Sequence, residues 1–189
     1  MIEIIDLHNS FGSNKVLRGV NLIIKEGESL AIIGRSGCGK SVLLKHIVGL
    51  LSPDEGYIKF EGKIINNLER KELYEVRRKF GFLFQGAALF DSMTVEENVS
   101  LALVESENRM SPEEIKKIVA EKHELVGLPG TQNLKPSELS GGMKKRVGLA
   151  RALVTNPKYI LYDEPTTGLD PIMSDSIDDL IKDLNEKLK

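Results

Sequence analysis

The stretch that decides the fold is Gly34-Arg35-Ser36-Gly37-Cys38-Gly39-Lys40-Ser41. It matches the pattern G-x-x-x-x-G-K-[ST], in which glycines let successive backbone N–H groups point inward at phosphate oxygens. The apolar run 30–33 before it predicts a strand buried on both faces. Apolar residues at helical spacing from Leu43 to Leu51 predict a helix after it. A chance glycine turn is the alternative, and the strand and helix predicted on either side disfavour it.

The loop predicts a nucleotide-phosphate site. A helix that begins at the loop adds the positive end of its dipole to the inward-pointing N–H groups. Lys40 is expected to reach the β- and γ-phosphates of ATP, and the Ser41 hydroxyl to bind Mg²⁺. The candidate binding residues are Gly34, Arg35, Ser36, Gly37, Cys38, Gly39, Lys40 and Ser41.

Two acidic residues, Asp163 and Glu164, directly follow the apolar run Tyr159-Ile160-Leu161-Tyr162, which predicts another buried strand. Asp163 is the candidate residue for holding Mg²⁺, and Glu164 the candidate for polarising the attacking water. An Asp-Glu pair after a strand is a weak signal alone. Behind a phosphate-binding loop it indicates a hydrolytic site.

The remaining patterns predict strands at 2–7, 20–24 and 81–84, and a hairpin over 57–60 and 63–65. A capping-box pattern starts a helix at Ser111, and another helix is predicted over 140–156. An apolar stripe from Ile177 to Leu188 predicts the last helix. Strands that alternate with helices indicate an α/β fold.

A second anion site is predicted at Leu139-Ser140-Gly141-Gly142-Met143, where a hydroxyl and two glycines precede a helix. Phe11, the 34–41 loop, Gln85, 139–142, 163–164 and Gly168-Leu169-Asp170 occur in the order of the ABC transporter ATPases. The chain resembles an ABC nucleotide-binding domain over essentially its whole length. This resemblance implies a P-loop NTPase fold with an N-terminal β subdomain and an inserted helical subdomain.

The resemblance implies that two ATP molecules, each with Mg²⁺, lie between two copies of the chain in a head-to-tail homodimer. Ser140, Gly141 and Gly142 of one copy would bind the ATP held by the other. Gln85 would bind Mg²⁺, sense the γ-phosphate and link to the membrane partner. Phe11 would stack on adenine, and Asp170 would belong to the loop that crosses between copies. The alternatives are a core aromatic for Phe11 and an ordinary polar loop residue for Gln85.

As a domain prediction, 1–189 is one ABC ATPase domain: 1–85 form the core and β lobe, 86–139 the helical lobe and 140–189 an incomplete return to the core. The family carries a switch histidine after the last of these motifs. The histidines here are His8, His46 and His123, all before Asp163. We therefore expect a chain truncated at its C-terminus with weak or absent turnover. A nucleotide-binding fragment without turnover is the alternative function.

The family's usual Gln is replaced by Met143. The stretches 83–90, 93–95, 98–99 and 136–143 resemble the ATPase of Mla/Mce-type phospholipid transporters. That resemblance implies two permease subunits and a lipid-binding Mce protein as partners, with this chain peripheral at the cytoplasmic face of the inner (plasma) membrane. Residues 87–90 are a candidate docking patch for a permease helix. The alternative places Leu89 and Phe90 in the core of the helical lobe.

The composition narrows the function classes. A net charge of -2 gives no support for a nucleic-acid partner, and the run Lys144-Lys145-Arg146 is interpreted as a solvated helix face. The single cysteine, Cys38, excludes an internal disulfide. No apolar run approaches the ~20 residues that cross a bilayer, and the first residues lack the basic region of a signal peptide. Any membrane role must come through a partner. One cassette with a short insert disfavours the ABC proteins of DNA repair and translation.

Overall fold

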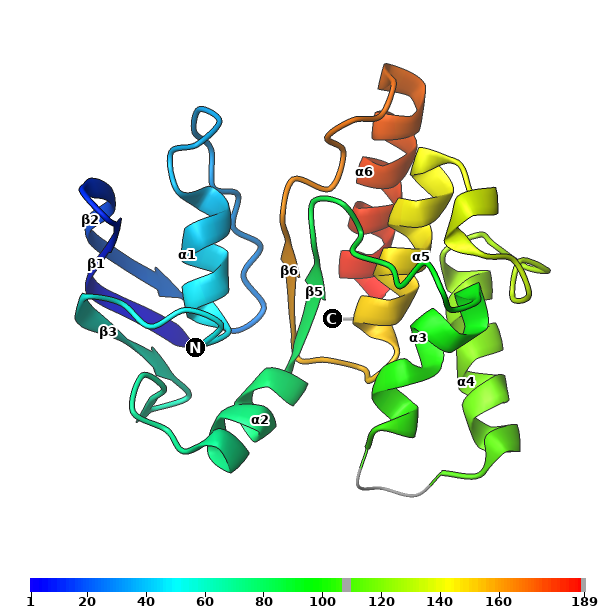
Figure 1. Cartoon of the computed structure of the whole chain (residues 1–189), viewed down its shortest axis with the longest axis horizontal. Coiled ribbons are helices and arrows are strands. Elements are labelled where there is room, and N and C mark those ends of the chain that lie inside the picture. Colours follow the sequence, from blue (N-terminus) through cyan, green and yellow to red (C-terminus); the bar gives the residue numbers. More distant parts are fainter. Residues whose placement is uncertain (107–109, 188–189) are drawn as a thin grey trace. The chain divides into compact units, whose positions relative to one another are not determined.

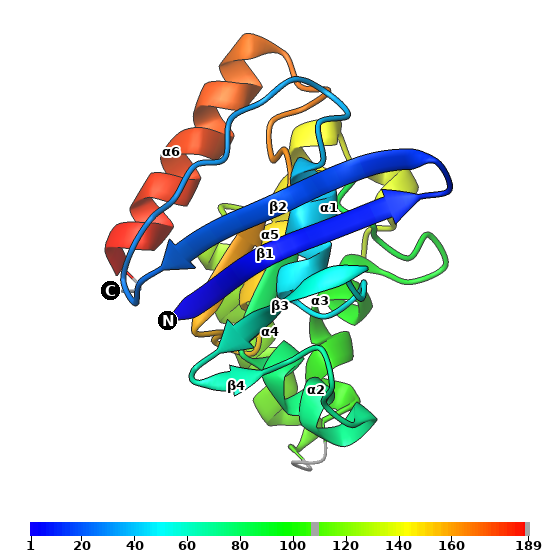
Figure 2. The same ribbon diagram turned by 90° about the vertical axis from the view of Figure 1, so that its left-hand side faces the viewer.

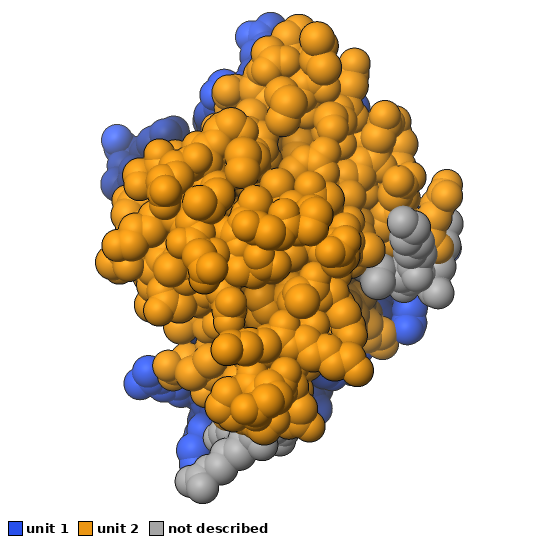
Figure 3. Space-filling view, turned by 90° about the vertical axis from the view of Figure 1, so that its right-hand side faces the viewer, with its two compact units in different colours: residues 1–79 blue, residues 80–189 orange. Residues whose placement is uncertain are grey.

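The computed structural model describes residues 1–106 and 110–187, in two compact units, Met1–Lys79 and Phe80–Lys189. Figure 3 colours the first unit blue and the second orange. Leu188, which the sequence placed in the last apolar stripe, lies outside the described residues. Within the described ranges, no helix has both the length and the apolar character needed to span a bilayer.

The first unit is built on an antiparallel sheet of strand order β2-β1-β3-β4. Strand β1 (Ile2–Phe11) pairs with β2 (Asn14–Ile24) on one side and with β3 (Glu55–Phe60) on the other, and β4 (Lys63–Ile64) pairs with β3. Figure 2 shows these strands with helix α1 (Lys40–Ile47) behind them. Helix α2 (Arg70–Arg78) ends the unit. Alternation along β1 buries Ile2 and Ile4, and burial resumes at Leu7 beyond an irregularity in the strand, as expected of a sheet with one covered face.

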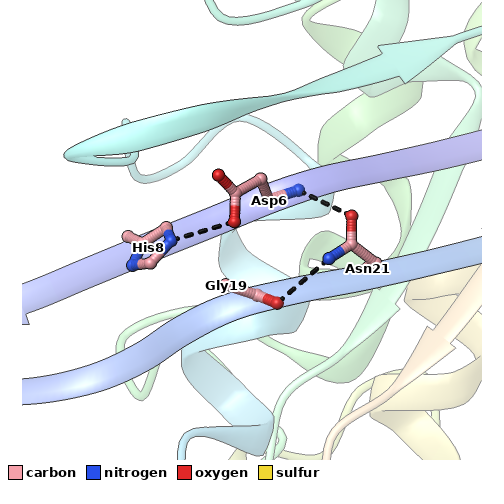
Figure 4. Close-up of polar contacts among 4 residues, drawn as sticks. All are labelled: Asp6, His8, Gly19 and Asn21. Carbon is pink, nitrogen blue, oxygen red and sulfur yellow. Dashed lines mark hydrogen bonds and ion pairs between the residues drawn. The ribbon is translucent and has the colours of Figure 1, made fainter.

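The pairing of β1 with β2 is interrupted by a bulge at Asp6 (Figure 4). Asp6 has a φ of 46°, and its N–H donates to Asn21 Oδ1 at 2.9 Å. Asn21 Nδ2 donates to the Gly19 carbonyl at 3.1 Å, and Asp6 Oδ1 lies 3.0 Å from His8 Nε2. Side chains thus replace backbone hydrogen bonds that the bulge removes.

The second unit contains a parallel pair of strands, β5 (Phe80–Leu83) and β6 (Tyr159–Tyr162). Its helices are α3 (Val95–Val104), α4 (Pro112–Leu125), α5 (Gly141–Leu153) and α6 (Pro171–Lys187), with a short 3₁₀ helix at Pro136–Glu138. Figure 1 shows β5 and β6 side by side, and α5 packs against β5, α3, α4 and α6. The core of this unit joins Leu83 of β5 to Val99, Val119 and Val147 of the helices.

Most predicted elements are confirmed, and two expectations are wrong. Residues 30–33 form no strand, and Ile33 is 94% exposed. A strand needs neighbours for its N–H and C=O groups, and the described residues pair β5 and β6 with each other and give 30–33 no pairing partner. Strand β6 forms as predicted, but its residues are half-buried rather than buried.

Helix α4 starts as the capping-box pattern predicted. Ser111 Oγ accepts from the Glu114 N–H at 3.2 Å, and the Glu114 carboxylate accepts from the Ser111 N–H at 2.7 Å. Near its end the helix buries His123 completely. Burial lowers the pKa of His123 below its ordinary 6.5, while an interaction with the Val119 backbone and the charge of Glu96 offset part of that change.

The depressed pKa of His123 predicts acid-sensitive stability. Just below pH 6.5 the unfolded chain binds this proton and the folded chain does not. The free energy of unfolding therefore falls as pH drops from about 6.5 toward the folded-state pKa, by up to about 1.4 kcal/mol per pH unit. In urea unfolding between pH 7.5 and 5.5, a His123→Leu variant should lose this part of the slope.

The matched control is Lys117→Gln, at an exposed position on the same helix. It should keep the wild-type pH dependence. If His123→Leu and the wild type lost stability equally between pH 7.5 and 5.5, the neutral buried imidazole would not be the cause.

Candidate functional site

The glycine-rich loop of the first unit curls around the side chain of Lys40. Lys40 Nζ donates to the carbonyls of Gly34 and Arg35, each at 3.1 Å. Gly39 has a φ of 101°, and a Cβ there would lie 3.0 Å from Val16 Cγ1. This position therefore needs glycine both for its backbone conformation and for its close approach to β2.

Helix α1 begins at Lys40 without a side-chain cap on its first turn. Gly34 to Cys38 are exposed, and Gly39 is buried. Uncapped N–H groups at the start of a helix attract anions, and the exposed loop leaves an anion a route to them. The geometry within this unit fits the predicted phosphate grip.

The far end of α1 is anchored by helix α2. Arg77 donates to the carbonyl of Val48 at 3.2 Å and to that of Gly49 at 2.6 Å. Helix α1 buries Leu43, Leu44 and Ile47 on one face. These contacts hold the helix that carries Lys40 and Ser41 at its start.

In the second unit, the ends of β5 and β6 bring two predicted catalytic residues together. The Asp163 N–H donates to the Leu83 carbonyl at 2.9 Å, which extends the pairing of the two strands by one residue. Just beyond, Gln85 Nε2 donates to Glu164 Oε2 at 2.9 Å, and Thr167 Oγ1 donates to the same oxygen at 3.1 Å. Asp163 is buried, with 4% of its surface exposed. Glu164 has a φ of 47°, which is uncommon for a residue other than glycine.

The structure adds Lys145, a residue of this site that the sequence reasoning missed. Lys145 is 5% exposed on α5, so the interpretation of 144–146 as a solvated helix face is wrong for it. Its Nζ donates to the Gln85 carbonyl and, at 3.3 Å, to the Glu164 carbonyl. Burial lowers the pKa of Lys145, while the charges of Asp163 and Glu164 raise it. The sequence signal for its burial was its position on the helix. Lys145 lies three residues after Gly142 and four before Leu149, and both of these residues are buried on α5.

The other cation of that run, Arg146, is also engaged. It donates to the Val126 carbonyl at 2.6 Å and to Ser176 Oγ at 2.8 Å, which ties α5 to the end of α4 and to α6. The solvated-face interpretation is therefore wrong for Arg146 as well. Lys144 is half-buried, and among the described residues no side-chain hydrogen bond or ion pair is recorded for it.

The segment after Gln85 is held by a second cation of the same helix. Arg151 donates to the carbonyls of Ala87 at 2.6 Å and Ala88 at 2.7 Å. These alanines have φ values of 59° and 48°, which cost free energy for residues with a Cβ. A Cβ on Gly148 would lie 2.7 Å from Leu83 Cδ1, so glycine lets α5 approach β5 at this point.

The predicted docking patch is divided by the structure. Ala87 is buried and Leu89 packs against the helical core, whereas Phe90 is 50% exposed. The core alternative therefore holds for Leu89 and is wrong for Phe90. Phe11, at the end of β1, is 52% exposed and is not a core aromatic.

The second predicted anion site forms the start of α5. Ser140 caps the helix, and its Oγ accepts from the Met143 N–H at 3.3 Å. Ser140 and Gly141 are exposed. Gly142 is buried against Met173 of α6. Ser140 and Gly141 thus face outward, while Gly142 packs inside the unit.

Each unit carries oxygen atoms of the kind that bind magnesium. Mg²⁺ takes oxygen ligands and is bound through one or two carboxylates together with substrate phosphates. Asp163 supplies a buried carboxylate directly after β6, and Ser41 and Gln85 carry oxygen donors. In the ranges that the structure describes, no three His, Cys, Asp or Glu side chains group into a metal cage.

Comparison with known protein families shows which family the chain belongs to. A family model described as "ABC transporter" matches residues 17–167. The chain belongs to the ABC transporter family. The ABC cassette is a P-loop NTPase fold, and the mixed α/β structure of the two units agrees with the fold class expected from the sequence.

Relatives in the ABC transporter family match almost the whole chain. It is 47% identical over 187 residues to the "Probable ribonucleotide transport ATP-binding protein mkl" of Mycobacterium leprae, covering 99% of this chain and 54% of that protein. It is 46% identical over 189 residues to the "Intermembrane phospholipid transport system ATP-binding protein MlaF" of Haemophilus influenzae, covering 100% of this chain and 71% of that protein. The chain thus spans about half the length of the first relative.

A solved ABC structure agrees with the fold. The ATP-binding cassette MJ0796, in a dimeric post-hydrolysis state bound to ADP and Pi, superposes with a TM-score of 0.90 at 40% identity. The match covers 99% of this chain and 84% of that chain.

Proposed function

We propose that this chain binds Mg-ATP and hydrolyses it as the nucleotide-binding subunit of an ABC transporter that moves phospholipid. The main structural support for hydrolysis is the 2.9 Å hydrogen bond from Gln85 Nε2 to Glu164 Oε2. It joins the two residues that sequence reasoning assigned to catalysis. The MJ0796 cassette was captured after hydrolysis, which supports the same activity here.

Each role in the proposed mechanism is assigned to particular residues of the chain. The loop N–H groups and Lys40 hold the phosphates by charge-assisted hydrogen bonds. Glu164 polarises the attacking water, because a carboxylate oriented by Gln85 and Thr167 presents a fixed acceptor. Bound Mg²⁺ would neutralise charge on the phosphates, with Ser41, Gln85 and Asp163 as its protein ligands. Phe11 is exposed at the end of β1 and is assigned to adenine stacking.

The proposed partners are a second copy of the chain and membrane permease subunits. Ser140 and Gly141 are exposed at the start of α5, where a second copy could supply ATP to them. Gly142 would act through its backbone. The dimeric MJ0796 cassette supports this arrangement. We place the complex at the cytoplasmic face of the inner membrane, with Phe90 on the permease side and a Mce-type protein as an indirect partner.

The transported substrate is proposed from likeness to MlaF. That relative's name specifies phospholipid, whereas the name of the mkl relative specifies ribonucleotide. The resemblance of 83–90 and 136–143, with Met143 in the second stretch, to Mla/Mce-type ATPases favours phospholipid.

We also propose that residues 1–189 belong to one ABC ATPase domain. Its core and β lobe span 1–85, its helical lobe 86–139 and its return to the core 140–189.

Removal of the loop lysine should weaken nucleotide binding. A charge-assisted hydrogen bond is worth about 1.5–3 kcal/mol, so Lys40→Ala should raise the ATP dissociation constant at least about tenfold. Equilibrium binding of a fluorescent ATP analogue measures this. The matched control is Lys45→Ala, in the last turn of α1, which should bind as wild type. Equal affinity of the Lys40→Ala and wild-type chains would remove Lys40 from the phosphate site.

A hydrolysis-deficient variant should accumulate the ATP-bound dimer. Glu164→Gln keeps the size of the side chain and removes the carboxylate that polarises water. With ATP and Mg²⁺ it should elute as a dimer in light-scattering chromatography, and Glu164→Gln combined with Ser140→Arg should elute as a monomer. A monomeric Glu164→Gln chain, even with its permease present, would contradict the ATP-bridged dimer.

Stimulation of ATP hydrolysis by the transported substrate distinguishes a phospholipid transporter from a ribonucleotide transporter. The complex with its permease, reconstituted in phospholipid nanodiscs, should release phosphate several-fold faster than the same complex in detergent, while added ribonucleotide should have no effect. Stimulation by ribonucleotide alone would overturn the phospholipid assignment. Normal ATP binding with background phosphate release would favour the nucleotide-binding fragment instead.

A further inference from the structure

Lys145 is a buried cation that bonds to backbone oxygens. Lysine is seldom buried unless its ammonium is satisfied. Here the Nζ donates to two carbonyls, those of Gln85 and Glu164, which lie 79 residues apart in the chain. The side chain reaches them from α5, so one helix connects the segment after β5 with the segment after β6.

Both carbonyls belong to the residues whose side chains meet at the proposed catalytic contact. The position of a backbone carbonyl constrains the Cα beside it, and so the point from which the side chain reaches out. Glu164 has a φ of 47°, a conformation that costs of order 1 kcal/mol or more in a residue with a Cβ. Its carbonyl is held by Lys145 Nζ and also by the Thr167 N–H at 3.2 Å.

We propose that Lys145 is a positioning residue for ATP hydrolysis. Its ammonium holds the backbones of Gln85 and Glu164 at the separation at which the Gln85 amide reaches the Glu164 carboxylate. This inference rests on the hydrolytic function proposed above. Lys145 itself acts only through these two residues.

The chemistry of lysine suits this task. Its ammonium has three donors, so it can serve two carbonyls at once. Methionine has a similar length and apolar character without a donor. Arginine can also donate to two oxygens through its fork. Arg151, by contrast, binds the carbonyls of Ala87 and Ala88 and none at Glu164, so it fixes one segment only.

Steady-state kinetics of the chain with its permease test the proposal. Lys145→Met should lower kcat about tenfold or more, because a small displacement of a catalytic group is costly, while KM for ATP stays within about twofold. Lys145→Arg should restore most of the rate. Lys144→Met, on the neighbouring half-buried position, is the control and should behave as wild type. An unchanged kcat in Lys145→Met would overturn the proposal.

A double-mutant cycle distinguishes positioning from general stabilisation. If Lys145 acts through the Gln85 contact, most of its effect should vanish when that contact is already gone. In a Gln85→Ala background, Lys145→Met should therefore lower kcat by less than about twofold. A full, additive loss of rate in that background would assign Lys145 a role in stability alone.

Hydrogen exchange provides a measurement that does not need turnover. The Ala87 N–H donates to the Phe84 carbonyl at 2.8 Å and the Thr167 N–H to the Glu164 carbonyl at 3.2 Å, next to the two attachment points. Both should exchange about tenfold faster in Lys145→Met and at the wild-type rate in Lys144→Met. Absent phosphate release by the wild type would contradict the proposed function alone. Unchanged exchange at both amides would overturn the role of Lys145.

Discussion

The parallel pairing of β5 with β6 is the constraint on which the second unit depends. Four residue pairs, from Phe80 with Tyr159 to Leu83 with Tyr162, align the two strands in the same direction. Both strands therefore end at one edge, where Asp163 directly follows β6 and Gln85 follows β5 after Phe84. The bond from the Asp163 N–H to the Leu83 carbonyl extends this alignment to the first residue of the acidic pair. In this register the side chains of Gln85 and Glu164, just beyond the strand ends, come within hydrogen-bond distance of each other.

Helix α5 turns this edge into a defined geometry. Lys145 satisfies the carbonyls of Gln85 and Glu164, and Arg151 satisfies those of Ala87 and Ala88. Glu164, Ala87 and Ala88 all have positive φ, so the helix donors oppose the conformational cost of three strained residues. Ser140 caps the same helix.

The phosphate loop of the first unit follows a different logic, because it is determined locally. Gly39 supplies the positive φ, Lys40 folds back over the carbonyls of Gly34 and Arg35, and α1 begins at once. All of these interactions join residues within seven positions of one another. Local interactions of this kind recur wherever the motif occurs, which explains why a motif of eight residues was enough to predict them.

The sequence alone determined the phosphate loop, most strands and helices, the capping box of α4 and the candidates Asp163 and Glu164. Each of these depends on the spacing of residues close together in the chain. The role of Gln85 was expected only from the resemblance to the ABC family. Tertiary structure alone decided that Lys145 is buried rather than solvated, that Leu89 and Phe90 differ in exposure, and that Gly142 packs under Met173. It also gave β6 half-buried faces and residues 30–33 no strand. The physical reason is that burial and strand pairing depend on neighbours distant in sequence, and periodicity does not identify those neighbours.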